Sequence, residues 1–145
     1  LKPAPAQQWG PLQKLGLAEE GGNWPQADLI LDALIGYGLQ GRPRSPILDW
    51  IIRANTSGRM ILALDAPSGL DITRGMISEI CIQADATLTL AMPKVGLLAP
   101  QAKRCVGELY LGDISVPPEL FAALSLGLKA ISPFDKDPIV RVLLP

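Results

Sequence analysis

Two apolar segments, residues 28–34 and 60–64, constrain the fold of this chain more than any other feature of its sequence. Each is a nearly unbroken apolar run, which is typical of a parallel strand that is covered on both faces. Between them, Ser45 and Pro46 predict the start of a helix, with the serine as N-cap and the proline at the first helical position. Apolar residues follow at helical spacing until Gly58. Strand–helix–strand units of this kind are right-handed crossovers, so we predict an α/β fold with a mostly parallel sheet.

The rest of the chain predicts further elements and three segments. Strands are expected at residues 86–91 and 108–111, and helices at residues 99–105 and 119–128. No strand-like run occurs before residue 28, so we interpret residues 1–27 as the remnant of a preceding helix and loop. The main α/β unit then covers residues 28–130, and the mixture of proline, charge and short apolar runs in residues 131–145 is typical of a linker or tail.

Composition excludes several classes of protein. The chain has 145 residues, a usual size for a single domain. Although 48% of its residues are hydrophobic, no apolar run approaches the roughly 18 to 20 residues of a membrane helix. The net charge is −1 and lysines and arginines do not cluster, which argues against nucleic acid as a partner. No basic and then apolar leader is visible at the first residues, so we expect a cytoplasmic protein.

The chain contains no histidine and two cysteines, Cys81 and Cys105. Their spacing is not that of a metal site, and we favour two free thiols over a disulfide. Without histidine, Ser–His and Cys–His nucleophile pairs are excluded. Proton transfer in this protein must therefore use Asp, Glu, Lys, Tyr, Cys or water.

Acidic residues stand at the ends of both apolar segments. In open α/β sheets, ligands bind beyond the carboxyl ends of the strands. Asp32 lies in an apolar strand, where a carboxylate must be paired, bound to a cation or protonated; a structural hydrogen bond to a nearby loop is an equal alternative. Asp65 precedes a sharp turn that contains Ser68, and we favour a role in a site for Asp65. Ser68 offers an oxygen ligand or is an ordinary turn serine, and Lys94 is either a phosphate partner or a solvated side chain.

A glycine-rich loop follows the first strand. Gly36, Gly38 and Gly41 have the spacing G-x-G-x-x-G of dinucleotide-binding turns. In such turns the third glycine lies inside the following helix. Here residues 42–46 separate Gly41 from the expected helix, so the evidence for a Rossmann oxidoreductase is weak.

The same loop is suited to an anion. Consecutive N–H groups of glycine-rich backbone can form an anion-binding nest, and Arg42 can add a bidentate contact to a phosphate. The alternative is a solvent-exposed turn that needs glycine only for its backbone angles. Tyr37 either flanks a ring of the ligand or covers the loop.

Several motifs together resemble one known family. Residues 32–41 read DALIGYGLQG and residues 65–71 read DAPSGLD, and residues 84–90, 93–97 and 109–114 continue the pattern in the same order. Over residues 28–118 the chain is similar to the NAD(P)H-hydrate epimerase family, also called the YjeF N-terminal domain. This resemblance implies a Rossmann-like three-layer αβα sandwich.

The resemblance also implies an activity and a site. The expected reaction is the interconversion of the R and S forms of hydrated NADH or NADPH, a repair of the nicotinamide cofactor. Asp32 and Ser68 would bind a potassium ion, and either Asp65 or Asp32 would move the proton. The residues expected to contact the substrate are Gly36, Tyr37, Gly38, Leu39, Gln40, Gly41, Arg42 and Asp65.

One element of the family pattern, the upstream loop of the type N-N-G-G-D, does not occur in this chain. The resemblance therefore implies that the sheet is incomplete at its N-terminal side and that residues 28–130 are the C-terminal portion of such a domain. We expect weak or no activity without the other half. The expected partner is an ADP- or ATP-dependent NAD(P)H-hydrate dehydratase, fused or separate, and a homodimer is left open. The alternative functions are a non-catalytic scaffold of the same fold and, less favoured, a Rossmann oxidoreductase.

Overall fold

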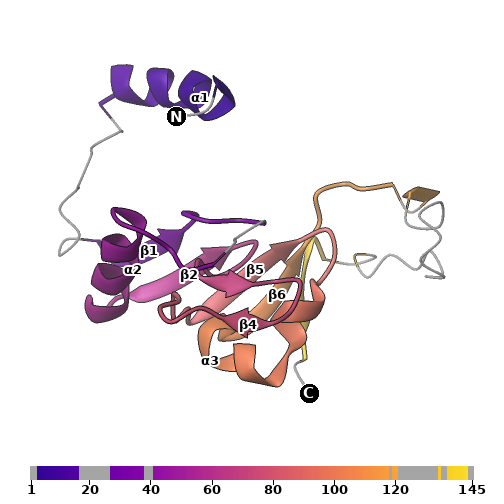
Figure 1. Cartoon of the computed structure of the whole chain (residues 1–145). Coiled ribbons are helices and arrows are strands. Elements are labelled where there is room, and N and C mark those ends of the chain that lie inside the picture. Colours follow the sequence, from indigo (N-terminus) through magenta and orange to yellow (C-terminus); the bar gives the residue numbers. More distant parts are fainter. Residues whose placement is uncertain are drawn as a thin grey trace.

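The computed structural model describes residues 3–16, 27–37, 41–117, 119–120, 134 and 137–143. Its main feature is a five-stranded sheet with the order β1-β2-β5-β6-β7, in which the first four strands are parallel and β7 is antiparallel (Figure 1). The elements in chain order are α1 (Pro3–Lys14), β1 (Leu29–Asp32), α2 (Ile47–Thr56), β2 (Met60–Leu64), β3 (Leu70–Asp71), β4 (Met76–Ile77), β5 (Ala86–Leu90), the 3-10 turns η2 (Val95–Leu98) and η3 (Pro100–Ala102), α3 (Lys103–Val106), β6 (Glu108–Gly112) and β7 (Ile139–Val142). The predicted α/β class with a mostly parallel sheet is confirmed.

The predicted strand–helix–strand unit is present as β1, α2 and β2. The two strands pair in parallel, with Leu29 opposite Met60 and Asp32 opposite Ala63. The predicted cap is wrong: α2 begins at Ile47, and Pro46 occupies the N-cap position without a side-chain hydrogen bond. The helix starts one residue later than the Ser-Pro pattern suggests. Ser45 therefore precedes the N-cap position, and its hydroxyl does not cap the helix.

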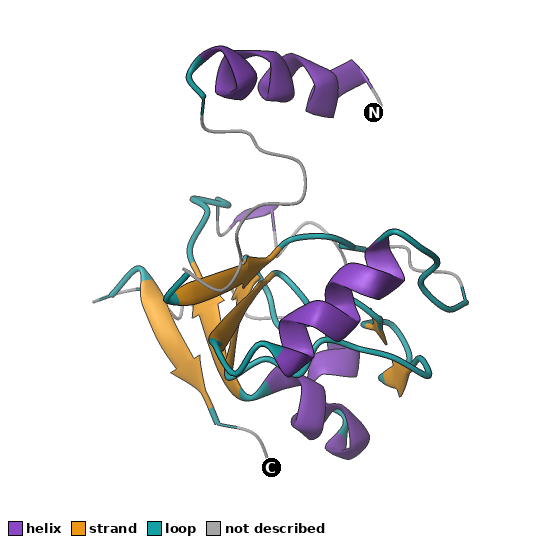
Figure 2. Cartoon of the chain, turned by 90° about the vertical axis from the view of Figure 1, so that its left-hand side faces the viewer, coloured by secondary structure: helices purple, strands orange, loops and turns teal. Residues whose placement is uncertain are grey.

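All the helices between β1 and β6 lie on one face of the sheet (Figure 2). Ile51 and Ala54 of α2 pack on Ile61 and Ala63 of β2. Farther along the same face, Val106 of α3 belongs to a second apolar cluster, which includes Leu109 of β6 and Leu97 of η2. The core therefore lies between the sheet and this single helical layer.

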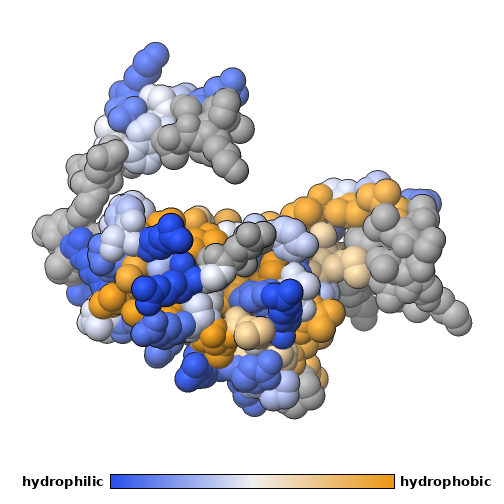
Figure 3. Space-filling view, viewed as in Figure 1, coloured by the Kyte–Doolittle hydropathy of each residue, from blue (hydrophilic) through white to orange (hydrophobic). Residues whose placement is uncertain are grey.

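The opposite face of the sheet is apolar and open in the part of the chain that the structure describes. Leu29, Leu31 and Met60 are more than half exposed there, at 51%, 58% and 63%. Helix α1 stands apart from the sheet (Figure 1), and hydrophobic residues reach the surface between clusters of hydrophilic ones (Figure 3). Of the three layers expected, the described residues thus supply the sheet and one helical layer.

The C-terminal segment differs from the prediction. Residues 131–145 were expected to be a linker or tail, but residues 139–142 form β7, which pairs with β6. The β-branched residues Ile139, Val140 and Val142 favour this strand, and Val142 packs against the core. Of the helix expected at residues 119–128, residues 119 and 120 are helical and the others lie outside the described residues. No helix in the described ranges is long and apolar enough to cross a membrane.

Candidate functional site

Asp32 is the last residue of β1 and is 2% exposed. Its carboxylate accepts hydrogen bonds from the backbone N–H of Ser68 (2.7 Å), the hydroxyl of Ser68 (2.7 Å) and the backbone N–H of Leu34 (3.3 Å). Such bonds to an ionised acceptor are stronger than those between neutral groups. A strand end and a turn that are far apart in the sequence are thereby joined through one carboxylate.

Ser68 links Asp32 to the start of the glycine loop. The serine is completely buried, and its hydroxyl oxygen accepts the N–H of Ile35 at 2.9 Å. The next residue, Gly69, has φ of +102°, and a Cβ built there would lie 2.5 Å from the carbonyl oxygen of Ile80. Only glycine tolerates this conformation and this close approach without displacement. The turn that holds Ser68 is therefore fixed by backbone packing as well as by hydrogen bonds.

Asp65 begins the same turn but faces other neighbours. Its φ is +66°, a left-handed conformation that aspartate adopts more readily than most residues. One carboxylate oxygen accepts the N–H of Leu90 at 3.2 Å and the hydroxyl of Thr89 at 3.4 Å, and it forms an ion pair with Lys94. Both side chains of the pair are 27% exposed. The Asp65 carboxylate is thus half-buried, beside a cation and within reach of solvent.

Lys94 is the residue whose role the sequence left open. Its ammonium group also donates to the hydroxyl of Thr89 and to the carbonyl oxygen of Leu90, both at 3.0 Å. A solvated lysine would have no such set of partners. The signal that could have indicated this role is the position of Lys94 shortly after a strand end, because the carboxyl ends of parallel strands meet at one edge of the sheet.

The two acidic residues lie at the carboxyl ends of neighbouring parallel strands. Asp32 is opposite Ala63, and Asp65 follows two residues later. Asp32 is directed to Ser68, whereas Asp65 is directed to the end of β5. They share no hydrogen-bond partner among the contacts above, so a single pocket enclosed by both carboxylates stays a prediction.

The glycine loop is only partly described. Gly36 and Tyr37 are exposed, and residues 38–40 (Gly38, Leu39 and Gln40) lie outside the described residues. Gly41 and Arg42 border a pocket of about 260 Å³, whose wall includes neither Asp32 nor Asp65. Arg42 forms an exposed ion pair with Glu79 at 3.2 Å.

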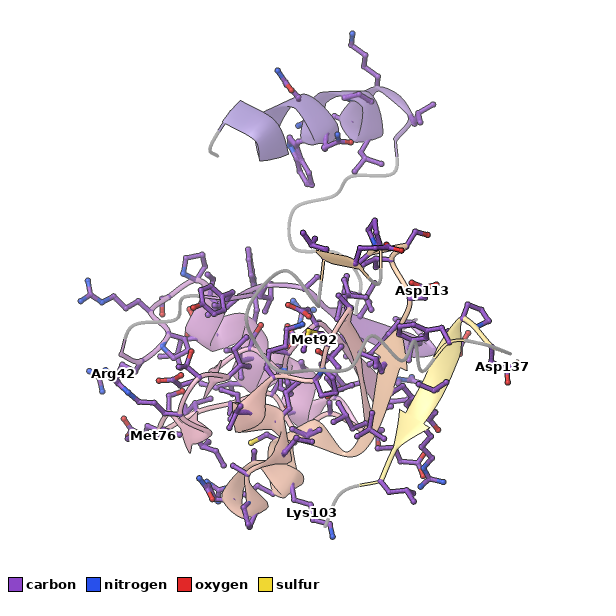
Figure 4. The ribbon with its side chains drawn as sticks, turned by 90° about the vertical axis from the view of Figure 1, so that its right-hand side faces the viewer. Arg42, Met76, Met92, Lys103, Asp113 and Asp137 are labelled. Atoms are coloured by element: carbon purple, nitrogen blue, oxygen red, sulfur yellow. The ribbon has the colours of Figure 1, made fainter. Side chains whose placement is uncertain are left out.

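The pocket beside Arg42 carries a second arginine. Arg74 contributes to the wall and lies 3.9 Å from Asp71, and Figure 4 shows Arg42 and Met76 at the same end of the molecule. The other lining residues are Gly69, Asp71, Met76, Ile77, Ser78 and Glu79. Two guanidinium groups and turn backbone offer donors for an anionic group, although each arginine is already paired with a carboxylate.

The oxygen atoms around Asp32 suit a hard cation. A carboxylate has about four lone-pair sites, of which three are used by Ser68 and Leu34, and the carbonyl oxygen of Ile35 lies 3.5 Å from the Ser68 hydroxyl. These acceptors of Asp32, Ser68 and Ile35 are oxygens, which hard cations prefer. Within the described ranges, no three His, Cys, Asp or Glu side chains gather as for a transition metal.

The chain is similar to known proteins over most of its length. Residues 4–96 match the family model described as YjeF-related protein N-terminus. The chain belongs to this family. The match begins upstream of residue 28 and includes α1, which the motif-based resemblance had left out.

The relatives are longer than this chain. The NAD(P)H-hydrate epimerase of Dehalogenimonas lykanthroporepellens is 42% identical over 118 residues, which are 81% of this chain and 46% of that protein. The bifunctional NAD(P)H-hydrate repair enzyme Nnr of Pyrobaculum aerophilum is 42% identical over 93 residues, 64% of this chain and 19% of that enzyme. The crystal structure of yeast ynu0 has the same fold, with a TM-score of 0.69 at 20% identity over 94% of this chain and 59% of that one. This chain spans about half the length of the epimerases that it matches.

Proposed function

We propose that this chain carries the catalytic carboxylate and part of the substrate site of an NAD(P)H-hydrate epimerase, which interconverts the R and S forms of hydrated NADH or NADPH. The observation that carries the proposal is the Asp65–Lys94 pair at a strand end, in a chain 42% identical to a protein of that name. A half-buried carboxylate within reach of solvent is suited to proton transfer near a bound ring. Asp65 is therefore our candidate for the group that moves the proton.

The position of Lys94 beside Asp65 supports this proposed role of Asp65. Its ammonium group is held by Thr89 and Leu90 as well as by Asp65, so it keeps a fixed positive charge beside the carboxylate. Fixed charges and dipoles stabilise developing charge without reorganisation during the reaction. Asp32, by contrast, is buried and accepts three hydrogen bonds, which favours a positioning role over proton transfer.

A potassium ion is part of the proposal. Asp32 and Ser68 would hold it through oxygen atoms, with the carbonyl oxygen of Ile35 close by. When bound there, the ion supplies positive charge near the glycine loop. Gly36, Tyr37, Gly41 and Arg42 would contact the phosphorylated part of the substrate, with Gly38, Leu39 and Gln40 completing the loop.

The expected partner is an ADP- or ATP-dependent NAD(P)H-hydrate dehydratase. Several relatives, including that of Pyrobaculum aerophilum, are named as bifunctional repair enzymes, which supports a dehydratase fused to this domain or working beside it. Epimerisation does not remove the added water, so a dehydratase is needed to return the hydrate to NADH or NADPH. Homodimerisation stays a prediction for the assembled protein.

The proposal is tested on this chain joined to the upstream half of a family member, which supplies the loop of the type N-N-G-G-D. The purified protein is coupled to an S-specific dehydratase supplied with ATP. The substrate is the R hydrate of NADH, and recovery of NADH absorbance is followed in potassium-containing and potassium-free buffer. We expect recovery to be faster with the protein and faster still with potassium. Asp65→Asn, which keeps the side-chain shape and tolerates the left-handed conformation, should lower the rate by at least about 100-fold, the usual contribution of a proton-transfer group.

Other outcomes separate the alternatives. Binding of the hydrate without any acceleration of recovery would support the scaffold and would contradict catalysis by this chain. Hydride transfer from NADH to an added substrate would support an oxidoreductase. Full turnover by Asp65→Asn would remove Asp65 from the mechanism and leave Asp32 as the remaining candidate.

A further inference from the structure

The two cysteines come together from distant parts of the chain. Cys81 follows β4 and Cys105 lies in α3, yet both belong to the same apolar cluster and are only 6% and 2% exposed. Each thiol shifts the pKa of the other, and no disulfide joins them. Two cysteines packed in one cluster and lining one pocket can form a disulfide if their Cα atoms lie within about 7 Å of each other.

A small pocket gives access to the pair. Its volume is about 230 Å³, and both cysteines line it together with Asn55, Gln83 and Arg104. Glu79 is the acidic residue of its wall. The volume exceeds that of a few water molecules, so the pocket has room for a small polar reagent beside the two cysteines.

The surroundings make the two thiols unequal. The hydrogen bond from Cys81 and the nearby Arg104 guanidinium lower the pKa of Cys105 to about 7, against the opposing effect of burial. The hydrogen bond with Cys105 and burial raise the pKa of Cys81, and the charge of Asp32 acts in the same direction. Cys105 is thus the more nucleophilic thiol of the pair and Cys81 the resolving thiol.

We propose that Cys81 and Cys105 form an oxidisable dithiol, a modification site at which a hydroperoxide converts the two thiols into a disulfide. The thiolate sulfur of Cys105 attacks one oxygen of hydrogen peroxide, the O–O bond breaks, and the released hydroxide takes up a proton to give water and a sulfenic acid. The sulfur of Cys81 then attacks the sulfenic sulfur, the S–O bond breaks, and a second water leaves. In balance, two thiols are oxidised by two electrons and one peroxide is reduced to two waters.

The backbone around Cys81 contacts the turn that holds Ser68. A Cβ on Gly69 would lie 2.8 Å from the Cα of Cys81, so the two backbones are in contact. The N–H of the next residue, Ile82, donates to the carbonyl oxygen of Ser68 at 2.9 Å. Movement of Cys81 toward Cys105 would therefore displace Ser68, which is hydrogen-bonded to Asp32. The dithiol is a property additional to the proposed epimerase activity.

The test is a peptide map of the whole protein after treatment with hydrogen peroxide and blocking of the remaining thiols. Trypsin separates the cysteines, because Cys81 falls in the peptide of residues 75–94 and Cys105 in that of residues 105–129. We expect the two peptides to be linked, with a combined mass lower by two hydrogens, and to separate after reduction. Met76, which is 61% exposed and lies in the first peptide, reports whether the peroxide reacted, because its thioether forms a sulfoxide.

Variants make the result decisive. Cys81→Ser should leave Cys105 as a sulfenic or further oxidised acid with no linked peptide. The rate of linkage in the unaltered protein should rise with pH around a midpoint near 7, the pKa of Cys105, and Arg104→Gln should move this midpoint to higher pH. Unlinked peptides that carry oxidised Met76, or a midpoint that Arg104→Gln does not move, would overturn the proposal, and neither result depends on epimerase activity.

Discussion

The Asp32 and Asp65 ends of neighbouring strands differ although their sequences look alike. Both carboxylates follow an apolar run and precede a glycine-containing loop. Asp32 is 2% exposed and is surrounded by uncharged donors from Ser68 and Leu34, whereas Asp65 is half-buried beside the Lys94 ammonium. The Asp32 end is closed by the backbone of a turn. The Asp65 end is open to solvent and has the positive charge of Lys94 beside its carboxylate.

This difference indicates that the two carboxylates have different roles. A carboxylate buried among donors holds pieces of structure together, and its removal leaves those donors unpaired. A partly exposed carboxylate beside a cation contributes little to stability and remains available to a ligand. We therefore expect the Asp32 side to govern folding and the Asp65 side to govern chemistry, and the following variants test that expectation.

The largest effect on stability is expected from Gly69→Ala, which moves the turn that carries Ser68. The new Cβ would meet the carbonyl oxygen of Ile80 at 2.5 Å, in a backbone conformation with φ of +102°. We expect the free energy of unfolding to fall by ~3 kcal/mol, measured by urea titration. Gly36→Ala is the matched control, since a Cβ there meets nothing within 4 Å, and a similar loss in both variants would contradict the argument from packing.

A smaller effect is expected from Asp32→Asn. The amide keeps one acceptor oxygen but places an N–H₂ group toward the donors of Ser68, so we expect a loss of ~2 kcal/mol in unfolding free energy. Asp65→Asn is the comparison, with an expected change below ~1 kcal/mol because that carboxylate is partly solvated. Equal losses of unfolding free energy in the two urea titrations would show that Asp32 and Asp65 contribute equally to stability.

The smallest effect is expected from Lys94→Gln. The glutamine can still donate to Asp65 or Thr89 while the charge is removed, so the unfolding free energy should change by less than ~1 kcal/mol. The rate of NADH recovery in the coupled assay should nevertheless fall clearly, because the fixed charge beside Asp65 is lost. If Lys94→Gln lowers the unfolding free energy by much more than this but leaves the rate of NADH recovery unchanged, Lys94 is a structural residue. The Asp65 side would then govern folding and not chemistry.

The sequence predicted the fold better than it predicted the contacts of the site. The alternation of apolar runs with a helix at residues 47–56 was readable, because strand and helix periodicities are local properties. The strand at residues 139–142 was not, because a short apolar run among prolines becomes a strand only when β6 offers its free edge. The start of α2 was misplaced by a residue for a similar reason, since the cap depends on the path by which the chain enters the helix.

The sequence by itself determined that Asp32 and Asp65 stand at strand ends and that the family motifs follow in order. Only the tertiary structure decided that Asp32 binds Ser68, that Asp65 pairs with Lys94, and that Cys81 meets Cys105. The physical reason is that each of these contacts joins residues more than twenty positions apart. Such contacts depend on strand register and on the path of the intervening loops, and no local pattern of residues encodes either of them.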